Sequence, residues 1–303
     1  MKTILAFGET LWDLLPSGPV LGGAPCNFAY RVNSLGDRGI LVTRLGRDEL
    51  GQRAFQRLQE LGMDTSFVQW DDEHPTGTVP VTIDANGVPD FTITPDVAFD
   101  HIELGDEILE QVLRADCIYF GSLIQRSGDS LRTLLALLNH NLLLRKPQAP
   151  VFVDLNFRKG CYTKASMHDS IPWADLIKLN HVEAAELSVV PATTPLEQAR
   201  CLYEQLAIPV VVTLGDQGAV AADRRKEGKI ETIQVPGWKV PVVDTVGSGD
   251  AFSAAFLHCW LRERSLEDCC FFGNALGAMV ASTAGATAPV SVDEINRFCG
   301  RSI

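Results

Sequence analysis

Short, nearly continuous apolar runs alternate with stretches of helical periodicity along most of the chain. The runs predicted as strands are Thr3 to Phe7, Ile40 to Leu45, Cys117 to Phe120, Val151 to Asp154, Leu176 to Leu179 and Val210 to Leu214. The helices predicted between and after them are Pro25 to Leu35, Glu49 to Leu61, Gly105 to Ala115, Ser130 to Leu144, Val182 to Val189, Leu196 to Leu206, Asp250 to Arg262, Leu266 to Thr283 and Val292 to Cys299. Strands that are apolar throughout are typical of a parallel sheet with helices on both faces. The alternation therefore predicts a doubly wound α/β fold.

Two stretches depart from this alternation. Residues 11–20 are apolar and interrupted by Pro and Gly, and residues 78–93 have the pattern of a hairpin with Asn86-Gly87 as its turn. We expect the two stretches to pair into a small sheet inserted in a single domain that spans 1–303. Such a sheet at the edge of an α/β domain would serve as a lid, as a dimer interface, or as both.

Composition and charge exclude several classes of protein. The chain of 303 residues carries a net charge of −12, and its longest basic run is 224–226, so no nucleic-acid partner is expected. No apolar run reaches the length of a membrane span, and acidic residues come too early in the chain for a signal peptide. The eight cysteines form no CxxC pair, which favours free thiols in a reducing compartment. The six histidines show no metal-binding spacing. These features predict a soluble cytoplasmic protein.

The segment 243–252, with the sequence VDTVGSGDAF, carries the strongest chemical signal. An apolar strand end leads through Gly247, Ser248 and Gly249 into a helix, so backbone amides and the helix dipole would converge on an anion. Asp250 in the first helical turn would then be placed to take a proton from a hydroxyl that attacks a phosphate. The same residues are also typical of an ordinary capped helix.

A second Gly-rich segment, GGAPCNFA, begins at Gly22 and Gly23 and precedes another helix. Asn27 lies at the start of that helix and offers both a donor and an acceptor, which suits sugar hydroxyls. Asp13 follows the first predicted strand. Each feature alone also fits an ordinary turn or loop. The chain lacks the P-loop pattern GxxxxGK followed by Ser or Thr, and it lacks GxGxxG after a strand, so a nucleotide would be held in another way.

Together these segments resemble the two signatures of the ribokinase-like (PfkB) carbohydrate kinases, in the same order and at similar spacing over nearly the whole chain. The run KLNHVE, from Lys178 to Glu183, resembles the family's NxxE stretch. The run TLGDQG, from Thr213 to Gly218, resembles its nucleotide loop. The resemblance implies a Rossmann-like, ribokinase-like α/β fold with a small β-sheet lid. It also implies transfer of the γ-phosphate of ATP to a sugar hydroxyl.

The resemblance implies a role for each matching residue. Asp250 would be the base, and the amides of Gly247, Ser248 and Gly249 would form the anion hole. The sugar would be held by Asp13, Gly22, Gly23 and Asn27, and the nucleotide by Asn180, Thr213, Gly215, Gly218 and Asn274. Glu183 would hold Mg²⁺ through water, and Asp244 would lie at a K⁺ site beside the anion hole. The family also suggests a homodimer through the lid.

The pattern GGAPCN, together with Phe7-Gly8-Glu9 and Asp13, is most similar to the fructokinase branch. Arg158 in the run DLNFR would reach the substrate or the transferred phosphate, or would form a surface ion pair. Sugar phosphates are disfavoured because the N-terminal half offers few cationic candidates. Fructose therefore leads, with 2-keto-3-deoxygluconate, ribose and other substrates of the family as alternatives. A non-catalytic sugar or nucleotide sensor on the same fold is the alternative from another class.

Overall fold

The computed structural model describes residues 1–15, 18–83, 89–126, 128–144, 148–158, 160–162, 169, 171–224 and 228–303, without the side chains of 81–83 and 89–91. Its strands are β1 (Thr3–Phe7), β2 (Leu11–Leu15), β3 (Gly18–Gly22), β4 (Arg38–Gly46), β5 (Val68–Asp71), β6 (Gly77–Ile83), β7 (Pro89–Phe91), β8 (Cys117–Gly121), β9 (Val151–Asp154), β10 (Leu176–Asn180), β11 (Val210–Thr213), β12 (Ala219–Asp223) and β13 (Glu231–Val235). Its helices are α1 (Ala24–Ser34), α2 (Glu49–Glu60), α3 (Asp106–Val112), α4 (Gly128–Leu143), α6 (His181–Leu187), α7 (Pro195–Leu206), α8 (Ser248–Trp260), α9 (Leu266–Ala281) and α10 (Val292–Cys299).

A nine-stranded sheet runs through the α/β body in the order β13-β12-β11-β10-β9-β8-β1-β4-β5. All pairs from β11 to β5 are parallel, whereas β12 and β13 add an antiparallel edge. After β1 the chain adds β4 and then β5 on one side of it, and later continues with β8 on the other side. The direction in which strands are added to the sheet therefore reverses between β1 and β8. In open α/β sheets, ligands bind at the carboxyl ends of the strands at such a reversal.

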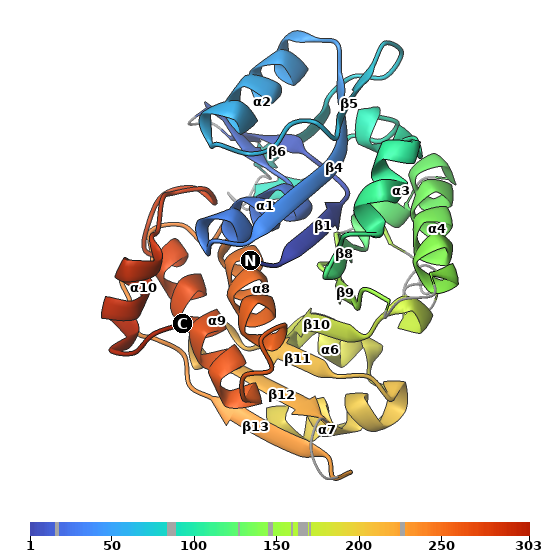
Figure 1. The fold of residues 1–303 in the computed structure, drawn as a ribbon. Coiled ribbons are helices and arrows are strands. Elements are labelled where there is room, and N and C mark those ends of the chain that lie inside the picture. Colours follow the sequence, from blue (N-terminus) through green and yellow to red (C-terminus); the bar gives the residue numbers. More distant parts are fainter. Residues whose placement is uncertain are drawn as a thin grey trace.

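Helices cover both faces of this sheet, as the fold class predicted (Figure 1). Successive residues of β1 point to opposite faces: Ile4 and Ala6 join a core with α1, α2, α8 and α9, while Leu5 and Phe7 join a core with α3, α4, α6 and α7. No helix in the described part of the chain is long and apolar enough to cross a bilayer.

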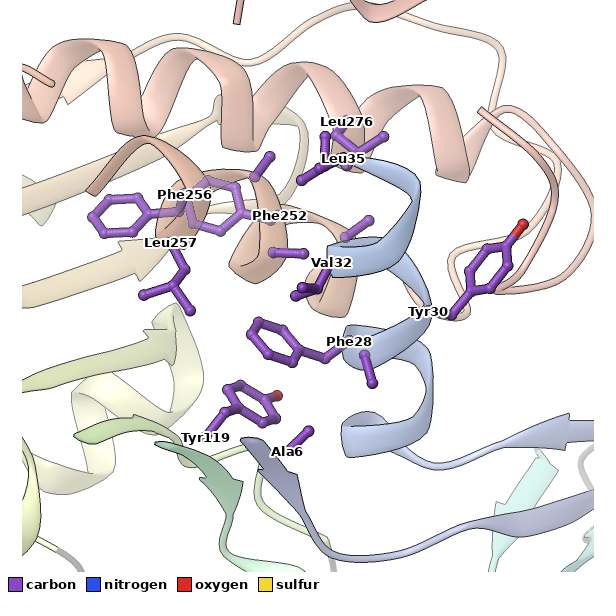
Figure 2. Close-up of a cluster of buried hydrophobic side chains, with 14 of the residues drawn as sticks. Ala6, Phe28, Tyr30, Val32, Leu35, Tyr119, Phe252, Phe256, Leu257 and Leu276 are labelled. Carbon is purple, nitrogen blue, oxygen red and sulfur yellow. The ribbon is translucent and has the colours of Figure 1, made fainter. Parts of the chain in front are cut away.

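The first of these cores fixes α1 against α8 (Figure 2). Phe28 of α1 stacks on Tyr119 of β8 with ring centroids 3.7 Å apart, and Phe252 and Phe256 of α8 pack into the same cluster. Burial of each such aromatic side chain contributes on the order of 2–3 kcal/mol. This packing brings the N-terminal ends of α1 and α8 together at the carboxyl edge of the sheet.

The small sheet predicted from 11–20 and 78–93 is present and has the strand order β3-β2-β6-β7. Within it, β2 pairs with β6 in parallel and with β3 in antiparallel orientation, and β6 pairs with β7 in antiparallel orientation. The predicted turn at Asn86-Gly87 lies outside the described residues. This lid sheet is built from two insertions in the chain, β2–β3 between β1 and α1 and β6–β7 after β5, so four connections join it to the α/β body.

Three strands were not predicted from the sequence. β12 is rich in Ala, which has low strand propensity, and β5 and β13 mix polar and apolar residues as is usual at sheet edges. The helices and strands that the sequence did predict are present, with ends displaced by a few residues.

Candidate active site

The first turns of α1 and α8 bring two polar side chains together. Nδ2 of Asn27 donates a hydrogen bond of 2.9 Å to Oδ2 of Asp250, and both residues are buried. Burial raises the pKa of Asp250 to about 6, although the bond from Asn27 and the charge of Lys178 act in the opposite direction. At neutral pH, Asp250 is therefore an ionised carboxylate that is a stronger base than an ordinary aspartate.

The helix that carries Asp250 begins at a glycine with left-handed backbone. Gly247 has φ of 75°, and a Cβ atom there would lie 2.3 Å from Cβ of Ala286, so only glycine fits. Backbone N–H of Ser248 donates to the carbonyl of Thr245. The amides of Gly249 and Asp250 have no acceptor among the residues that the structure describes. The anion hole was predicted from the amides of Gly247, Ser248 and Gly249; with the Ser248 amide bonded to Thr245, the amides of Gly249 and Asp250 are the donors left in the first turn of α8 to bind an anion at the positive end of the helix dipole.

A buried ion pair lies next to this helix start. Nζ of Lys178 in β10 lies 3.1 Å and 3.2 Å from the carboxylate oxygens of Asp154 in β9. Oγ of Ser253 and the hydroxyl of Tyr119 also donate to Oδ2 of Asp154, at 2.8 Å and 3.3 Å. A Cβ atom at Gly249 would lie 3.4 Å from Nζ of Lys178. Lys178 thus adds a fixed positive charge to the anion site.

Neither member of this pair was predicted as a site residue. A sequence signal does exist, because Lys178 interrupts the otherwise apolar run LIKL, and Asp154 ends the apolar run VFVD. A charged residue in a buried strand needs a partner. The two residues could therefore have been predicted to pair once β9 and β10 were known to be adjacent strands.

The lid sheet contributes Asp13 from β2. A Cβ atom at Gly22 would lie 2.8 Å from Oδ2 of Asp13, and one at Gly23 would lie 2.4 Å from the backbone oxygen of Glu9. The two glycines therefore allow close approach of the β3–α1 turn to Asp13 and to the chain after β1. Burial raises the pKa of Asp13, while the positive charge of Arg158 lowers it.

Glu9 is a further residue that the sequence motifs did not assign to the site. It follows β1 and is 5% exposed, and its Oε1 accepts a bond from the amide of Ala24. Burial raises its pKa to about 7. Its Oε2 and the Oδ1 of nearby Asn27 are buried polar atoms without a partner among the described residues. Such atoms in a native protein indicate a place for a ligand that can hydrogen-bond to them.

The predicted nucleotide residues lie along the β10–β12 edge of the sheet. Asn180 caps α6 by accepting bonds from the amides of Val182 and Glu183, and the carboxylate of Glu183 accepts bonds from the amides of Asn180 and Phe157. Both carboxylate oxygens of Glu183 thus already bind one amide each, which leaves their remaining lone pairs for water or a cation.

Further along this edge, Thr213 ends β11 and donates from its hydroxyl to the carbonyl of Leu179. Gly215 and Gly218 both have positive φ, and a Cβ atom at Gly218 would lie 2.1 Å from the backbone oxygen of Val235. From α9, Nδ2 of Asn274 donates to the carbonyls of Val235 and of residue 236. Asn274 therefore positions this loop beside Gly218.

The last two predicted site residues differ in their contacts. Asp244 accepts bonds from the amides of Val246 and Gly285, so it joins the loop before α8 to the loop after α9. Arg158 is exposed and forms no ion pair with any residue of the described part of the chain, and its charge lowers the pKa values of Glu9, Asp13 and Asp250.

Comparisons with known proteins agree with this arrangement. The family model described as pfkB family carbohydrate kinase matches residues 19–293. Fructokinase-1 of Zea mays is 30% identical, with 94% of this chain and 93% of that protein covered. The crystal structure of fructokinase with bound ATP from Xylella fastidiosa superposes with a TM-score of 0.83, at 22% identity and 98% coverage of both chains. A Vibrio cholerae fructokinase crystallised with fructose, ADP and a calcium ion gives 0.82, at 23% identity and 99% coverage of both chains.

The family model covers most of the chain, including the Asn27 and Asp250 segments and the α/β body between them. The Zea mays relative extends the match over nearly the whole length of both proteins. The chain belongs to the pfkB family of carbohydrate kinases and is an ATP-dependent phosphotransferase.

Proposed function

We propose that this kinase phosphorylates fructose, with Mg²⁺-ATP as the second substrate. The observation that supports this best is the buried Asn27–Asp250 pair beside the free amides at the start of α8. The unpaired atoms of Glu9 and Asn27 next to this pair suit the hydroxyls of a neutral sugar. Relatives of this chain over nearly its full length are named fructokinases.

In the proposed reaction, a sugar hydroxyl lies against Asp250, whose carboxylate accepts the proton as the oxygen attacks the γ-phosphate. The amides of Gly249 and Asp250 and the ammonium of Lys178 stabilise the negative charge on the transferred phosphoryl group. As the new bond forms, the bond from the γ-phosphorus to the β-phosphate oxygen breaks and ADP leaves. A Mg²⁺ ion bound with ATP would neutralise phosphate charge. Asn180 and Glu183 would orient the waters of that ion. The lid sheet would exclude bulk water, which would otherwise accept the phosphate.

Sugar recognition is assigned to residues from three places in the fold. Asp13 of the lid would accept hydrogen bonds from one or two hydroxyls, and Gly22 and Gly23 would let the sugar ring approach the backbone. Glu9 would accept or donate, depending on its protonation state. Thr213, Gly215, Gly218 and Asn274 would border the nucleotide on the opposite side of the anion site.

One observation favours a second substrate. The guanidinium of Arg158 is exposed and has no carboxylate partner among the described residues, yet its charge reaches Asp13 and Glu9. A free guanidinium beside a sugar site suits a carboxylate, so 2-keto-3-deoxygluconate is the alternative acceptor. A non-catalytic sensor is disfavoured because a sensor has no need of a base next to an anion site.

Two further parts of the proposal concern K⁺ and oligomeric state. Asp244 lies at the loop where K⁺ would bind, and Arg31 donates to the carbonyls of Ala286 and Ala288 in the same loop. Replacement of Na⁺ by K⁺ at constant ionic strength tests for activation. Sedimentation analysis of the purified protein tests for a homodimer through the lid.

The substrate is tested by measuring ADP release with fructose, ribose, 2-keto-3-deoxygluconate, a nucleoside and fructose phosphates. We expect the highest kcat/KM with fructose. A higher value with 2-keto-3-deoxygluconate that falls to the fructose value in Arg158→Ala would establish the alternative. No ADP release with any sugar, together with measurable sugar binding, would identify a sensor.

A further inference from the structure

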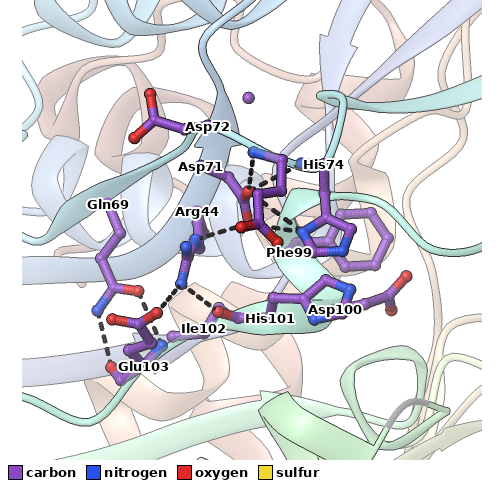
Figure 3. A network of polar contacts seen from close by, with 12 residues as sticks. Arg44, Gln69, Asp71, Asp72, His74, Phe99, Asp100, His101, Ile102 and Glu103 are labelled. Carbon is purple, nitrogen blue, oxygen red and sulfur yellow. Dashed lines mark hydrogen bonds and ion pairs between the residues drawn. The ribbon is translucent and has the colours of Figure 1, made fainter.

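A polar hollow of about 690 Å³ lies where the lid connects to the α/β body, outside the active site described above. Two chain segments meet there: 71–76, which leads from β5 into β6, and 92–101, which leads from β7 through the 3₁₀ helix Ala98–His101. They run side by side, because the amide of Ala98 donates to the carbonyl of residue 75 at 2.8 Å. Figure 3 shows the side chains that meet between these segments.

Two histidines, one from each segment, stack in this hollow. The rings of His74 and His101 have centroids 3.6 Å apart and an interplanar angle of 14°. Nδ1 of His74 lies 3.1 Å and 3.2 Å from the carboxylate oxygens of Asp71, and Nδ1 of His101 lies 2.7 Å from Oδ2 of Asp129. A carboxylate at Nδ1 holds the proton on that nitrogen, which leaves the Nε2 lone pair free to bind an electrophile.

Both Nε2 atoms face one further carboxylate. Oδ1 of Asp96 lies 3.0 Å from Nε2 of His101 and 3.8 Å from Nε2 of His74. When Nδ1 carries the proton, each Nε2 presents a lone pair to a negatively charged oxygen. A proton on Nε2 of His101 satisfies the 3.0 Å contact, while Nε2 of His74, at 3.8 Å, lies beyond hydrogen-bond distance. A single proton can bridge only one of the two nitrogens to Asp96, whereas a metal ion can bind both nitrogens and the carboxylate together.

The dimensions and charge of the cluster fit a metal ion. The donor atoms of His74, Asp96 and His101 all lie within 4.8 Å of one another, compared with roughly 3.3 Å in a tetrahedral site with bonds of about 2 Å. The two rings would have to turn out of their stacked arrangement so that both in-plane lone pairs point to one ion. The hollow is lined by more acidic than basic residues, and the side chain of Asp96 next to the two histidines is 78% exposed.

We propose that His74, His101 and Asp96 form a binding site for a divalent transition-metal ion that joins two of the lid connections, the one before β6 and the one after β7. Two imidazole nitrogens and one carboxylate oxygen suit Zn²⁺, Ni²⁺ or Cu²⁺, whereas Mg²⁺ prefers oxygen ligands alone. Asp71 and Asp129 orient the two rings from behind. His74 is separated from Asp96 and His101 by β6 and β7, so spacing in the sequence gives no sign of the site.

The first test is calorimetric titration of Zn²⁺ into the full-length protein at pH 7.5 without nucleotide. We expect one site in the wild type, and loss of that site in Asp96→Asn and in His101→Gln. His181→Gln removes an exposed histidine elsewhere and should bind like the wild type. All of these variants retain the eight cysteines, so binding that persists in Asp96→Asn and His101→Gln would place the zinc on thiols and overturn the proposal.

A matched pair of variants separates ligand geometry from simple charge attraction. Asp129→Asn and Asp72→Asn each remove one negative charge from the same hollow, but only Asp129 contacts a histidine ring. We expect Asp129→Asn to weaken Zn²⁺ binding 10- to 100-fold, as is typical when the partner of a ligating histidine is lost. Asp72→Asn should have less than a threefold effect. Equal effects of the two changes would show non-specific attraction and would overturn the proposed site.

Hydrogen exchange provides an independent measurement. Zn²⁺ should slow exchange in the segments 72–76 and 92–101 of the wild type, because the ion joins them, and should have no such effect in Asp96→Asn. Unchanged exchange in the zinc-loaded wild type would contradict a link between the two lid connections.

Discussion

Asp250 and Glu9 are two buried carboxyl groups whose pKa values are raised by the same cause, loss of contact with water. Their surroundings differ. The hydrogen bond from Asn27 and the charge of Lys178 lower the pKa of Asp250 and keep it ionised at neutral pH, whereas Glu9 is close to half-protonated. One site therefore contains a group that can accept a proton and a second group that can either donate or accept a hydrogen bond.

We expect Asp250→Asn to lower kcat by about 10²- to 10⁴-fold, because the amide cannot accept the proton of the attacking hydroxyl. Sugar and nucleotide affinities should change much less, since the interaction matters chiefly in the transition state. Steady-state kinetics and calorimetry measure the two effects. If Asp250 only supports the helix start, Asn replaces it well there, and a folded variant with near wild-type kcat would remove the catalytic assignment.

The dependence of activity on pH follows from the same residue. A base is active only when it is deprotonated, so kcat/KM should fall as the pH is lowered through about 6, the pKa of Asp250. An ordinary aspartate would retain activity down to about pH 4. A pH–rate profile with saturating nucleotide measures this, and the decrease should remain in Glu9→Gln. A flat profile between pH 5 and 7 would contradict the assignment.

Glu9 should affect stability rather than the chemical step. Its pKa in the folded protein, about 7, exceeds the ordinary value of 4.5, so its contribution to stability is greatest below pH 4.5 and is lost as the pH rises through 7. The ionised group costs about 3 kcal/mol at pH 8 by this linkage. We expect Glu9→Gln to raise the unfolding temperature more at pH 8 than at pH 5. Glu103→Gln, at a side chain exposed by 76%, is the control and should show no such difference.

The residues predicted for the site lie in contiguous motifs. Asn27 follows twin glycines and Asp250 follows Gly-Ser-Gly, and the resemblance of these motifs to a known family, in the same order, implied a role for each. Lys178 and Asp154 come from different strands, and their meeting depends on the sheet order and on burial by α8. Sequence spacing does not contain that information.

At the scale of helices and strands, the lid sheet differs from the body. It has four short strands, and its last strand, β7, has three residues. A sheet of this size is a good candidate for a low-stability element that a ligand orders. We expect the amides of β6 to exchange more slowly when sugar is bound, with exchange in β8 unchanged as an internal control. Equal protection of β6 with and without sugar would indicate a static interface.

Periodicity predicted the buried helices and strands because each buries a regular face or a continuous apolar run. It failed for β5, β12 and β13. These strands are short and lie at the two ends of the sheet. There, pairing with the adjacent strand determines the structure more than the strand propensity of the residues does. The lid was recognised as a departure from the pattern, but its parallel β2–β6 pairing could not be foreseen from local sequence.

At the scale of the whole molecule, the proposed active site combines residues of the lid and the body. Asp13 belongs to a lid strand, whereas Asn27 and Asp250 begin helices of the body. We expect Asp13→Ala to weaken sugar binding tenfold or more, from loss of a charged hydrogen bond worth roughly 1.5–3 kcal/mol. ATP affinity should be nearly unchanged. Calorimetry with each ligand separately measures both, and an unchanged sugar Kd would exclude Asp13 from the site.

The position of Asp13 in β2 also determines what a measured sugar affinity means. A sugar that contacts both Asp13 and the body spans the two parts of the molecule, so its observed Kd combines the strength of the contacts with the free-energy difference between open and closed lid. Some changes far from the sugar would favour closure, including changes at the two connections around His74 and His101. Each such change would tighten sugar binding by the same factor by which it increases the closed population. Sugar titration can therefore serve as a thermodynamic measure of lid closure in this kinase.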